Sequence, residues 1–313
     1  MKRLLALILC LALCAGLCAG CGGEKESGAR VSVVTTCFAL YDWARNVAGD
    51  ADGVEITWLM DSGVDPHSFQ PAVDDLLAVA NSDVFVFVGG ESDQWTADAV
   101  EGMTKPDAQA VNLLEALGDA AVAEEDDPGA KDEHVWMSIR NAQTCVDCIC
   151  AALCKADPQN DDVYQMNAAD YKNALQTLDG EYADAVAAAE KHAIVVADRF
   201  PFAYLAADYD LDYRAAFPGC SAESEASFQT VLHLAQYTIE EGLPVVLVTE
   251  NGDGAVAEAV AETVEENTGE EPPVRTLDSL QSVTAEIAAD GATYLSVMES
   301  NLEVLKEALL WHS

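Results

Sequence analysis

The 313-residue chain has few basic side chains: 15 Lys and Arg stand against 55 Asp and Glu, for a formal net charge of −40. It contains no polybasic tract, and a surface this negative repels phosphate backbones, so nucleic-acid binding is excluded. Glycine, proline and aromatic residues occur in ordinary numbers, which excludes collagen-like, low-complexity and fibrous proteins. Half of the residues are hydrophobic, so the acidity belongs to the surface of a folded chain of about two domains.

The N-terminus has the pattern of an export signal. Lys2 and Arg3 precede an apolar run that is marginal in length, and too rich in Ala, Gly and Cys, for a strong membrane span. We predict a signal peptide over residues 1–20 and a tether over residues 21–29. The sequence Cys-Ala-Gly-Cys that ends at Cys21 resembles the lipobox of bacterial lipoproteins, with Cys in place of the usual Leu. It predicts a lipid on Cys21 and a protein anchored to the extracytoplasmic face of the cell membrane; an ordinary secreted protein is the alternative.

The ten cysteines do not form a recognisable metal motif. Four belong to the signal, and four others crowd one segment: Cys145, Cys148, Cys150 and Cys154. We expect this segment to be a helix from Ser138, as its N-cap, to Ala156. At about 100° per residue the first two thiols share one face and the last two point nearly opposite, so the four cannot bind one ion. They are expected to be small buried residues, while a disulfide from Cys37 or Cys220 stays open in an exported protein.

Strand-like runs alternate with helical periodicity along the chain. The runs are Val31–Thr36, Val54–Met60, Val84–Val88, Ala193–Ala197, Pro244–Thr249 and Val274–Leu277. Their β-branched residues do not alternate with polar ones, which predicts an α/β fold of mainly parallel sheets flanked by helices.

A different pattern separates the third run from the fourth. Apolar residues recur at steps of three and four over residues 162–191, which predicts one amphipathic helix about 45 Å long. The stripe consists of Tyr164, Ala168, Tyr171, Leu175, Leu178, Tyr182 and Val186. We expect it to join two lobes, with an N-terminal lobe over residues 30–158, the spanning helix over 159–191 and a C-terminal lobe over 192–313.

Two of the five histidines stand out by position. His67 lies in a loop that follows a predicted strand and is stiffened by Pro66 and Pro71, and His134 lies just ahead of the Ser138 helix. Loops at the edges of the sheets are where open α/β folds bind their ligands. Both histidines are therefore candidate metal ligands. The other three have simpler explanations. His192 lies at the end of the long helix, where an imidazolium suits the helix dipole, His233 is a packed or exposed residue of a helical stretch, and His312 is terminal.

Two acids occupy matching places in the second lobe. Asp198 and Asp278 each follow a predicted strand directly, where an N-cap is the alternative role. Two imidazoles and two carboxylates together suit Zn²⁺ or Mn²⁺ and are too rich in nitrogen for Ca²⁺ or Mg²⁺. Three other acids rank second for the carboxylate positions: Glu223, Glu225 and Glu250.

The chain resembles the cluster of solute-binding lipoproteins that serve zinc and manganese ABC importers. The matching segments are Val33–Thr36, Leu40–Asp42, Gly63–Phe69, Asp132–Trp136, Asp198–Leu205, Thr276–Leu280, Gly291–Met298 and Asn301–Leu302. The resemblance implies two α/β lobes joined by a long helix, with the metal held between them. Carried over by position, the four ligands are His67, His134, Asp198 and Asp278.

The sequence departs from the family pattern in two places. Asp198 lies one residue further from Tyr204 than the usual family spacing, so its match to the family pattern is the weakest of the four. The stretch Ala120–Glu133 is acidic and contains no histidine, whereas zinc-importing relatives tend to carry a His-rich loop there. The acidic loop could concentrate cations at the site, or it could be a plain solvated loop.

The resemblance implies a monomeric, lipid-anchored receptor that captures zinc, or manganese next, and delivers it to an ABC permease. We expect affinity to fall as the pH drops through the histidine range, near 6.5, and release to need only small shifts. The alternatives are a binding protein for a siderophore or other organic ligand, and a zinc metallohydrolase. Four protein ligands leave no open position for catalysis, and no His-Glu-x-x-His helix occurs, so we predict no enzyme activity.

Overall fold

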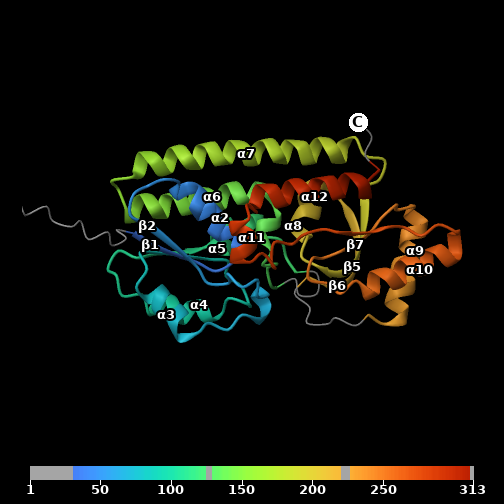
Figure 1. The fold of residues 1–313 in the computed structure, drawn as a ribbon, viewed down its shortest axis with the longest axis horizontal. Coiled ribbons are helices and arrows are strands. Elements are labelled where there is room, and N and C mark those ends of the chain that lie inside the picture. The colour runs from blue at the N-terminus through green and yellow to red at the C-terminus, as the bar shows by residue number, and fades with distance from the viewer. Residues whose placement is uncertain (1–30, 125–128, 220–225, 311–313) are drawn as a thin grey trace, which may run out of the picture.

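Two four-stranded sheets, one in each half of the chain, form the framework of the protein (Figure 1). The computed structural model describes residues 31–124, 129–219 and 226–310. The strand order is β2-β1-β3-β4 in the first sheet and β6-β5-β7-β8 in the second, and all neighbouring strands pair in parallel. The strands are β1 Val31–Thr35, β2 Val54–Trp58, β3 Val84–Phe87, β4 Gln109–Asn112, β5 Ala193–Phe200, β6 Asp212–Pro218, β7 Val246–Val248 and β8 Val274–Thr276. The predicted α/β fold of two parallel-sheet lobes is confirmed.

Complete burial explains why the central strands had a clear sequence pattern, while the edge strands differed: β2 and β8 were predicted and β4 and β6 were not. The central strands β3 and β7 are buried at every residue, and both lie within predicted runs. The edge strands β4 and β6 were not predicted, and they contain exposed or half-buried polar residues instead of a β-branched run. An edge strand is covered on fewer sides than a central one, so its sequence is not forced to be continuously apolar.

The long predicted helix is α7, Asp161–Ala187, which runs along both lobes (Figure 1). Every residue of the predicted apolar stripe is buried in it. Leu175, at the middle of the stripe, is 0% exposed, whereas Met166 on the outer face of the same helix is 59% exposed. The helix therefore packs both lobes against one continuous surface.

A second helix, α12 (Tyr294–Ala308), lies beside α7 and also connects the lobes (Figure 1). Its first residue donates its backbone N–H to the buried carboxylate of Asp42 in the N-terminal lobe, at 3.1 Å. Near its other end, Glu307 pairs with Arg275 of β8 at 2.8 Å. Midway, the Tyr182 hydroxyl of α7 donates to the Met298 carbonyl at 2.7 Å.

The remaining helical segments are all shorter than α7. They are α2 Phe38–Ala48, η1 Pro66–Ser68, α3 Val73–Ala80, α4 Trp95–Glu101, α5 Leu113–Leu117, η2 Gly118–Ala120, η3 Val135–Met137, α6 Ile139–Ala156, α8 Ala203–Tyr209, α9 Phe228–Glu241, α10 Ala255–Thr268 and α11 Ala285–Ala289. Helix α6 begins as predicted, because the Ser138 side chain accepts the Asn141 backbone N–H at 2.9 Å.

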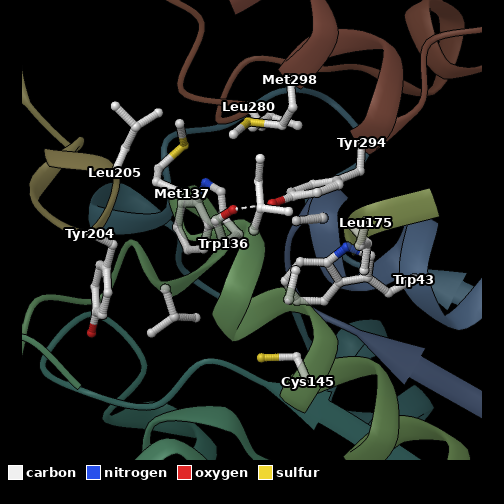
Figure 2. Packing of buried hydrophobic residues seen from close by; sticks show 14 of the residues in the cluster. Trp43, Trp136, Met137, Cys145, Leu175, Tyr204, Leu205, Leu280, Tyr294 and Met298 are labelled. Atoms are coloured by element: carbon white, nitrogen blue, oxygen red, sulfur yellow. Dashed lines mark hydrogen bonds between the residues drawn. The ribbon is translucent and has the colours of Figure 1, made fainter. Parts of the chain in front are cut away.

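The main apolar core continues across the junction of the two halves (Figure 2). There the Trp136 indole N–H donates to the Ser279 carbonyl at 2.8 Å, and the Tyr294 hydroxyl donates to the Trp136 carbonyl at 2.7 Å. Trp136 follows His134 by two residues, and Ser279 follows Asp278. The core therefore ties together the two loops that carry predicted ligands.

The cysteines of the described residues are free thiols. Cys145 and Cys150 are buried, and Cys148 and Cys154 are partly buried, which agrees with a packing role. Burial raises the pKa of the Cys37 thiol to about 12, so this thiol is protonated and unreactive at neutral pH.

Several predictions of the N-terminal segment fall outside the described residues. They concern the signal peptide over residues 1–20, the tether over residues 21–29 and the lipid on Cys21; Cys220 is also outside. Among the described residues, none of the helices combines the length and the apolar character needed to cross a bilayer.

Candidate metal site

Two histidines that lie 67 positions apart in the chain meet at the ends of two loops. His67 is in η1, whose first turn is capped by the Asp65 side chain. His134 directly precedes η3 and is 0% exposed. The Nε2 atoms of the two rings are 3.1 Å apart. The structure thus brings the two predicted nitrogen ligands into contact.

Asp132 determines which nitrogen of His134 is free. One of its carboxylate oxygens accepts the His134 backbone N–H at 2.8 Å and lies 3.1 Å from Nδ1 of the same residue. An ionised carboxylate only accepts hydrogen bonds, so Nδ1 carries the proton and Nε2 keeps its lone pair. His134 therefore has the tautomer that a metal ligand at Nε2 requires.

Ser92, which is held in turn by Glu133, contacts the His67 ring. Nδ1 of His67 lies 2.7 Å from the Ser92 hydroxyl oxygen and 3.7 Å from a Glu133 carboxylate oxygen. Glu133 also accepts the Ser92 backbone N–H at 2.8 Å. Gly90, at φ +91°, leaves room for this carboxylate, because a Cβ at that position would collide with Glu133. A serine hydroxyl can donate or accept, so Ser92 is compatible with either tautomer of His67.

The two rings are arranged so that a cation can replace a proton between them. Burial, followed by the neighbouring His134, lowers the pKa of His67 to about 4, so His67 is neutral at pH 7. At the observed spacing, Nε2–H of His67 can donate to the lone pair of His134. If His67 instead donates Nδ1–H to Ser92, two lone pairs face each other and can bind one metal. Two nitrogen ligands of a tetrahedral zinc lie about 3.3 Å apart, close to the spacing observed here.

Asp198, at the carboxyl end of β5, is engaged by its own lobe. Its carboxylate accepts the Arg199 backbone N–H at 2.8 Å, the Thr249 backbone N–H at 3.2 Å and the Thr249 hydroxyl at 2.5 Å. Gly252 packs so closely against it that a Cβ there would collide with the carboxylate. Asp198 thus supports the turn between β7 and α10, a role that sequence spacing alone did not predict.

Arg199 reaches from the second lobe to the His67 loop. Its guanidinium donates to one Asp65 oxygen at 2.9 Å, and the other Asp65 oxygen accepts the His67 backbone N–H at 2.9 Å. Burial alone would raise the pKa of Asp65, but the His67 amide and the Arg199 charge outweigh it and lower that pKa below its usual value. Arg199 is also the residue that the usual family spacing from Tyr204 would select in place of Asp198.

Asp278 follows β8 and lies in a strained turn. Its carboxylate accepts the Leu280 backbone N–H at 2.7 Å, and Leu280 has a φ of +61°, which is costly for a branched side chain. Glu250 accepts hydrogen bonds from the backbone and hydroxyl of Ser279 and from the Gln281 backbone. Burial, and then the charge of Glu250, raises the pKa of Asp278 to about 6. An unpaired negative charge is therefore costly in this turn.

Within residues 31–124, 129–219 and 226–310, no three His, Cys, Asp or Glu side chains lie close enough together to hold a metal. The structure thus brings together His67 and His134, and it leaves Asp198 and Asp278 in their own turns. Of the rival acids, Glu250 supports the Asp278 turn, whereas Glu223 and Glu225 lie outside the described residues.

The residues that orient the histidines were not predicted as part of the site. Asp132 has a local signal, because an acid two residues before a histidine can bond both its backbone and its ring. Ser92 and Glu133 have no such signal, since their contacts depend on how two separate loops pack.

His67 lines a cavity of about 830 Å³ to which residues of both halves of the chain contribute. His67, Ser92 and Glu133 contribute to one wall, and Phe200 and Tyr213 to another. These two aromatic rings stack with their centroids 3.8 Å apart. Further acidic residues line the cavity: Glu91, Glu124, Asp132, Asp210 and Asp212. A cavity with this lining is accessible to a cation.

Comparison with known proteins agrees with this geometry. A family model described as "Zinc-uptake complex component A periplasmic" matches residues 33–308. The chain belongs to this family. The family consists of solute-binding proteins of zinc uptake and not of enzymes, which confirms the predicted family and the prediction that the chain is not an enzyme.

Three similar proteins carry zinc in their names. The zinc-binding lipoprotein AdcA of Streptococcus pneumoniae is 29% identical over 297 residues, which cover 92% of this chain and 57% of that protein. The high-affinity zinc uptake system protein ZnuA of Bacillus subtilis is 29% identical over 299 residues, covering 92% of this chain and 91% of that protein. The crystal structure of the Zn(II)-bound ZnuA-like domain of Streptococcus pneumoniae AdcA has a TM-score of 0.71 at 28% identity, covering 89% of this chain and 98% of that domain. The chain therefore spans little more than half of AdcA, and zinc, the metal predicted first, is the metal that these three names give.

Proposed function

We propose that the protein captures a divalent transition metal as its transported substrate, with zinc preferred and manganese next. The observation that carries this proposal is the pair of imidazole Nε2 atoms 3.1 Å apart, each on a ring whose Nδ1 atom has its own hydrogen-bond partner. Such partners orient metal-binding histidines and set their tautomers. The names of the relatives support zinc in particular.

The proposed ligands are His67, His134, Asp198 and Asp278. The two carboxylates would have to exchange hydrogen bonds within their own turns for bonds to the metal. For Asp278 this exchange is favoured, because a cation would compensate the negative charge that burial beside Glu250 disfavours. For Asp198 the exchange costs more free energy, since its carboxylate accepts three hydrogen bonds that metal binding would disturb.

We further propose that the metal is held between lobes formed by residues 30–158 and 192–313, with the helical segment 159–191 between them. The loaded protein would act as a monomer and deliver its metal to the permease of an ABC importer. A lipid on Cys21 would hold it at the extracytoplasmic face of the cell membrane. The lipoprotein name of AdcA and the periplasmic name of the family support this location.

Metal analysis and titration test the proposed cargo. Protein purified without added metal is analysed for bound elements, and zinc and manganese are then titrated in competition. We expect one zinc per chain, displaced by manganese only at large excess, because intrinsic affinity favours zinc at nitrogen-containing sites. No binding of either metal would contradict the proposal.

Single alanine variants of the four ligands test the site. We expect His67→Ala and His134→Ala to weaken zinc binding at least 100-fold, since both lie at the proposed metal position. His233→Ala is the matched control, because that histidine is exposed on α9. X-ray absorption of the zinc-loaded protein should show two nitrogen ligands at about 2.0–2.1 Å beside the oxygen ligands. Binding that is equal in all variants would refute the ligand set.

A further inference from the structure

Arg199 is a positively charged residue beside a site proposed for a cation, and its geometry explains how both can be present. The Arg199 guanidinium and the Asp65 carboxylate are 2.9 Å apart, with 27% and 24% of their side chains exposed. Asp65 belongs to the first half of the chain and Arg199 to the second. This ion pair therefore bridges the two lobes beside the histidines.

The bridge acts directly on the His67 loop. The Asp65 oxygen that does not meet Arg199 accepts the backbone N–H of His67 at 2.9 Å and caps η1. A continuous series of hydrogen bonds thus leads from the guanidinium to the carboxylate and on to the backbone of a proposed ligand. For His67 to swing away from a bound metal, its loop must move relative to Asp65 or carry Asp65 away from Arg199.

The local backbone of β5 aims Arg199 at this position. The pairing register of β5 with β6 shifts between Val196 and Arg199, and such irregularities redirect side chains near functional sites. The Asp198 carboxylate accepts the Arg199 backbone N–H at 2.8 Å, and it also accepts a hydrogen bond from the Thr249 hydroxyl. The guanidinium therefore extends from a well-supported point of the second lobe.

We propose that the Arg199–Asp65 ion pair is a latch between the lobes that slows release of the bound metal by holding the His67 loop in place. This inference rests on the proposed function. Arg199 acts here as a positioning residue and contacts no metal. The competing hypothesis is that the positive charge of Arg199 merely repels the metal. Replacing Arg199 should speed metal release if it is a latch and slow release if it only repels the metal.

Stopped-flow release of zinc to a chelator tests the latch in a double-mutant cycle. The variants are Arg199→Met, Asp65→Asn and the double variant; Asn at position 65 keeps an oxygen for the His67 N–H. We expect each single variant to speed release about tenfold, equivalent to about 1.4 kcal/mol, and the double variant to match the singles. Association rates should change less than twofold. Arg199→Lys should restore most of the slow release, because an ammonium group can still reach one carboxylate oxygen.

The control variant is Arg275→Met, which breaks an exposed ion pair with Glu307 in the second lobe and should leave release unchanged. Slower release from Arg199→Met would show simple repulsion and overturn the latch, as would additive effects in the double variant. Wild-type protein that binds no zinc would refute the proposed function itself. Zinc binding in which neither Arg199→Met nor Asp65→Asn changes release refutes the latch alone.

Discussion

The partner of the second ring nitrogen decides whether a histidine can bind a metal. Asp132 keeps the proton of His134 on Nδ1, and Ser92 can accept or donate opposite Nδ1 of His67. Both rings can therefore present Nε2 lone pairs without losing a proton to solvent. The binding capacity of the pair depends on these neighbours as well as on the histidines.

Asp132→Asn should weaken zinc binding by about 10- to 100-fold. The amide oxygen can still accept the His134 backbone N–H, but it is uncharged and accepts more weakly from Nδ1–H, so the tautomer with a free Nε2 lone pair is less strongly favoured. Glu91→Gln is the control, because Glu91 lines the same cavity and carries the same charge but is exposed. Calorimetric titration measures both. An equal loss in the two variants would mean that charge alone, and not ring orientation, sets the affinity.

The Asp278 carboxyl gives a pH dependence of known sign. Burial and the charge of Glu250 raise its pKa in the folded protein to about 6, above the 3.8 of a free side chain, so the folded protein holds an extra proton between these values. This carboxyl therefore costs stability at pH 7, and the cost disappears as the pH falls to about 4. Asp278→Asn should raise the free energy of unfolding of the metal-free protein by about 2 kcal/mol at pH 7 and by far less at pH 4.

Urea unfolding at the two pH values measures this difference. Glu299→Gln removes an exposed carboxylate of α12 and controls for the change in total charge. Stabilisation by Asp278→Asn that is equal at both pH values would show that packing, and not ionisation, is responsible.

At the residue scale, the two predicted histidines meet in the structure, whereas the predicted acids lie in turns that the sequence did not describe. Pro66 and the strand before it confined His67 to a defined loop, and His134 was close to a recognisable helix start. The orientation of Asp198 depends instead on an irregularity in β5 and on the turn at Thr249, both of which arise from pairing with distant strands. No local sequence pattern therefore predicts the orientation of the Asp198 side chain.

At the element scale, helix α7 owes its position to one apolar stripe. Its buried residues alternate with polar ones that face solvent, so the helix gains its stability from packing more than from intrinsic propensity. The periodicity of the stripe was sufficient to predict both the helix and its buried face.

Leu175→Ala should lower the free energy of unfolding by about 2–5 kcal/mol, because the residue is 0% exposed and a cavity would remain. Met166→Ala on the outer face of the same helix, where the side chain is 59% exposed, should change it by less than about 0.5 kcal/mol. Urea unfolding of the two variants and wild type makes the comparison. Similar losses in both would contradict the assignment of the buried face.

The elements that the sequence did not reveal were missed for two physical reasons. Strands β4 and β6 lie at sheet edges, where exposed polar residues are tolerated and the apolar pattern is interrupted. The connecting role of α12 was also missed, because it depends on contacts with Asp42 and Tyr182, far away in the sequence.

At the scale of the whole molecule, two helices and a shared core join the lobes. Helices α7 and α12 both contact the two halves, and Trp136 bonds the loop of one proposed ligand to that of another. A wide opening would have to break these buried contacts together. Small movements of the loops, and of the Arg199–Asp65 pair, are less costly.

Zinc binding should therefore change the radius of gyration by less than about 1 Å, compared with an overall value of about 19 Å for a chain of this length. Solution scattering of metal-free and zinc-loaded protein measures the change, and Mg²⁺, which prefers oxygen ligands, provides the control. Tyr182→Phe removes the hydrogen bond between α7 and α12 and should allow a larger difference between the two states. Contraction of wild type by more than about 2 Å would show that the two connecting helices do not restrain the lobes, and release would then have to be explained by hinge opening.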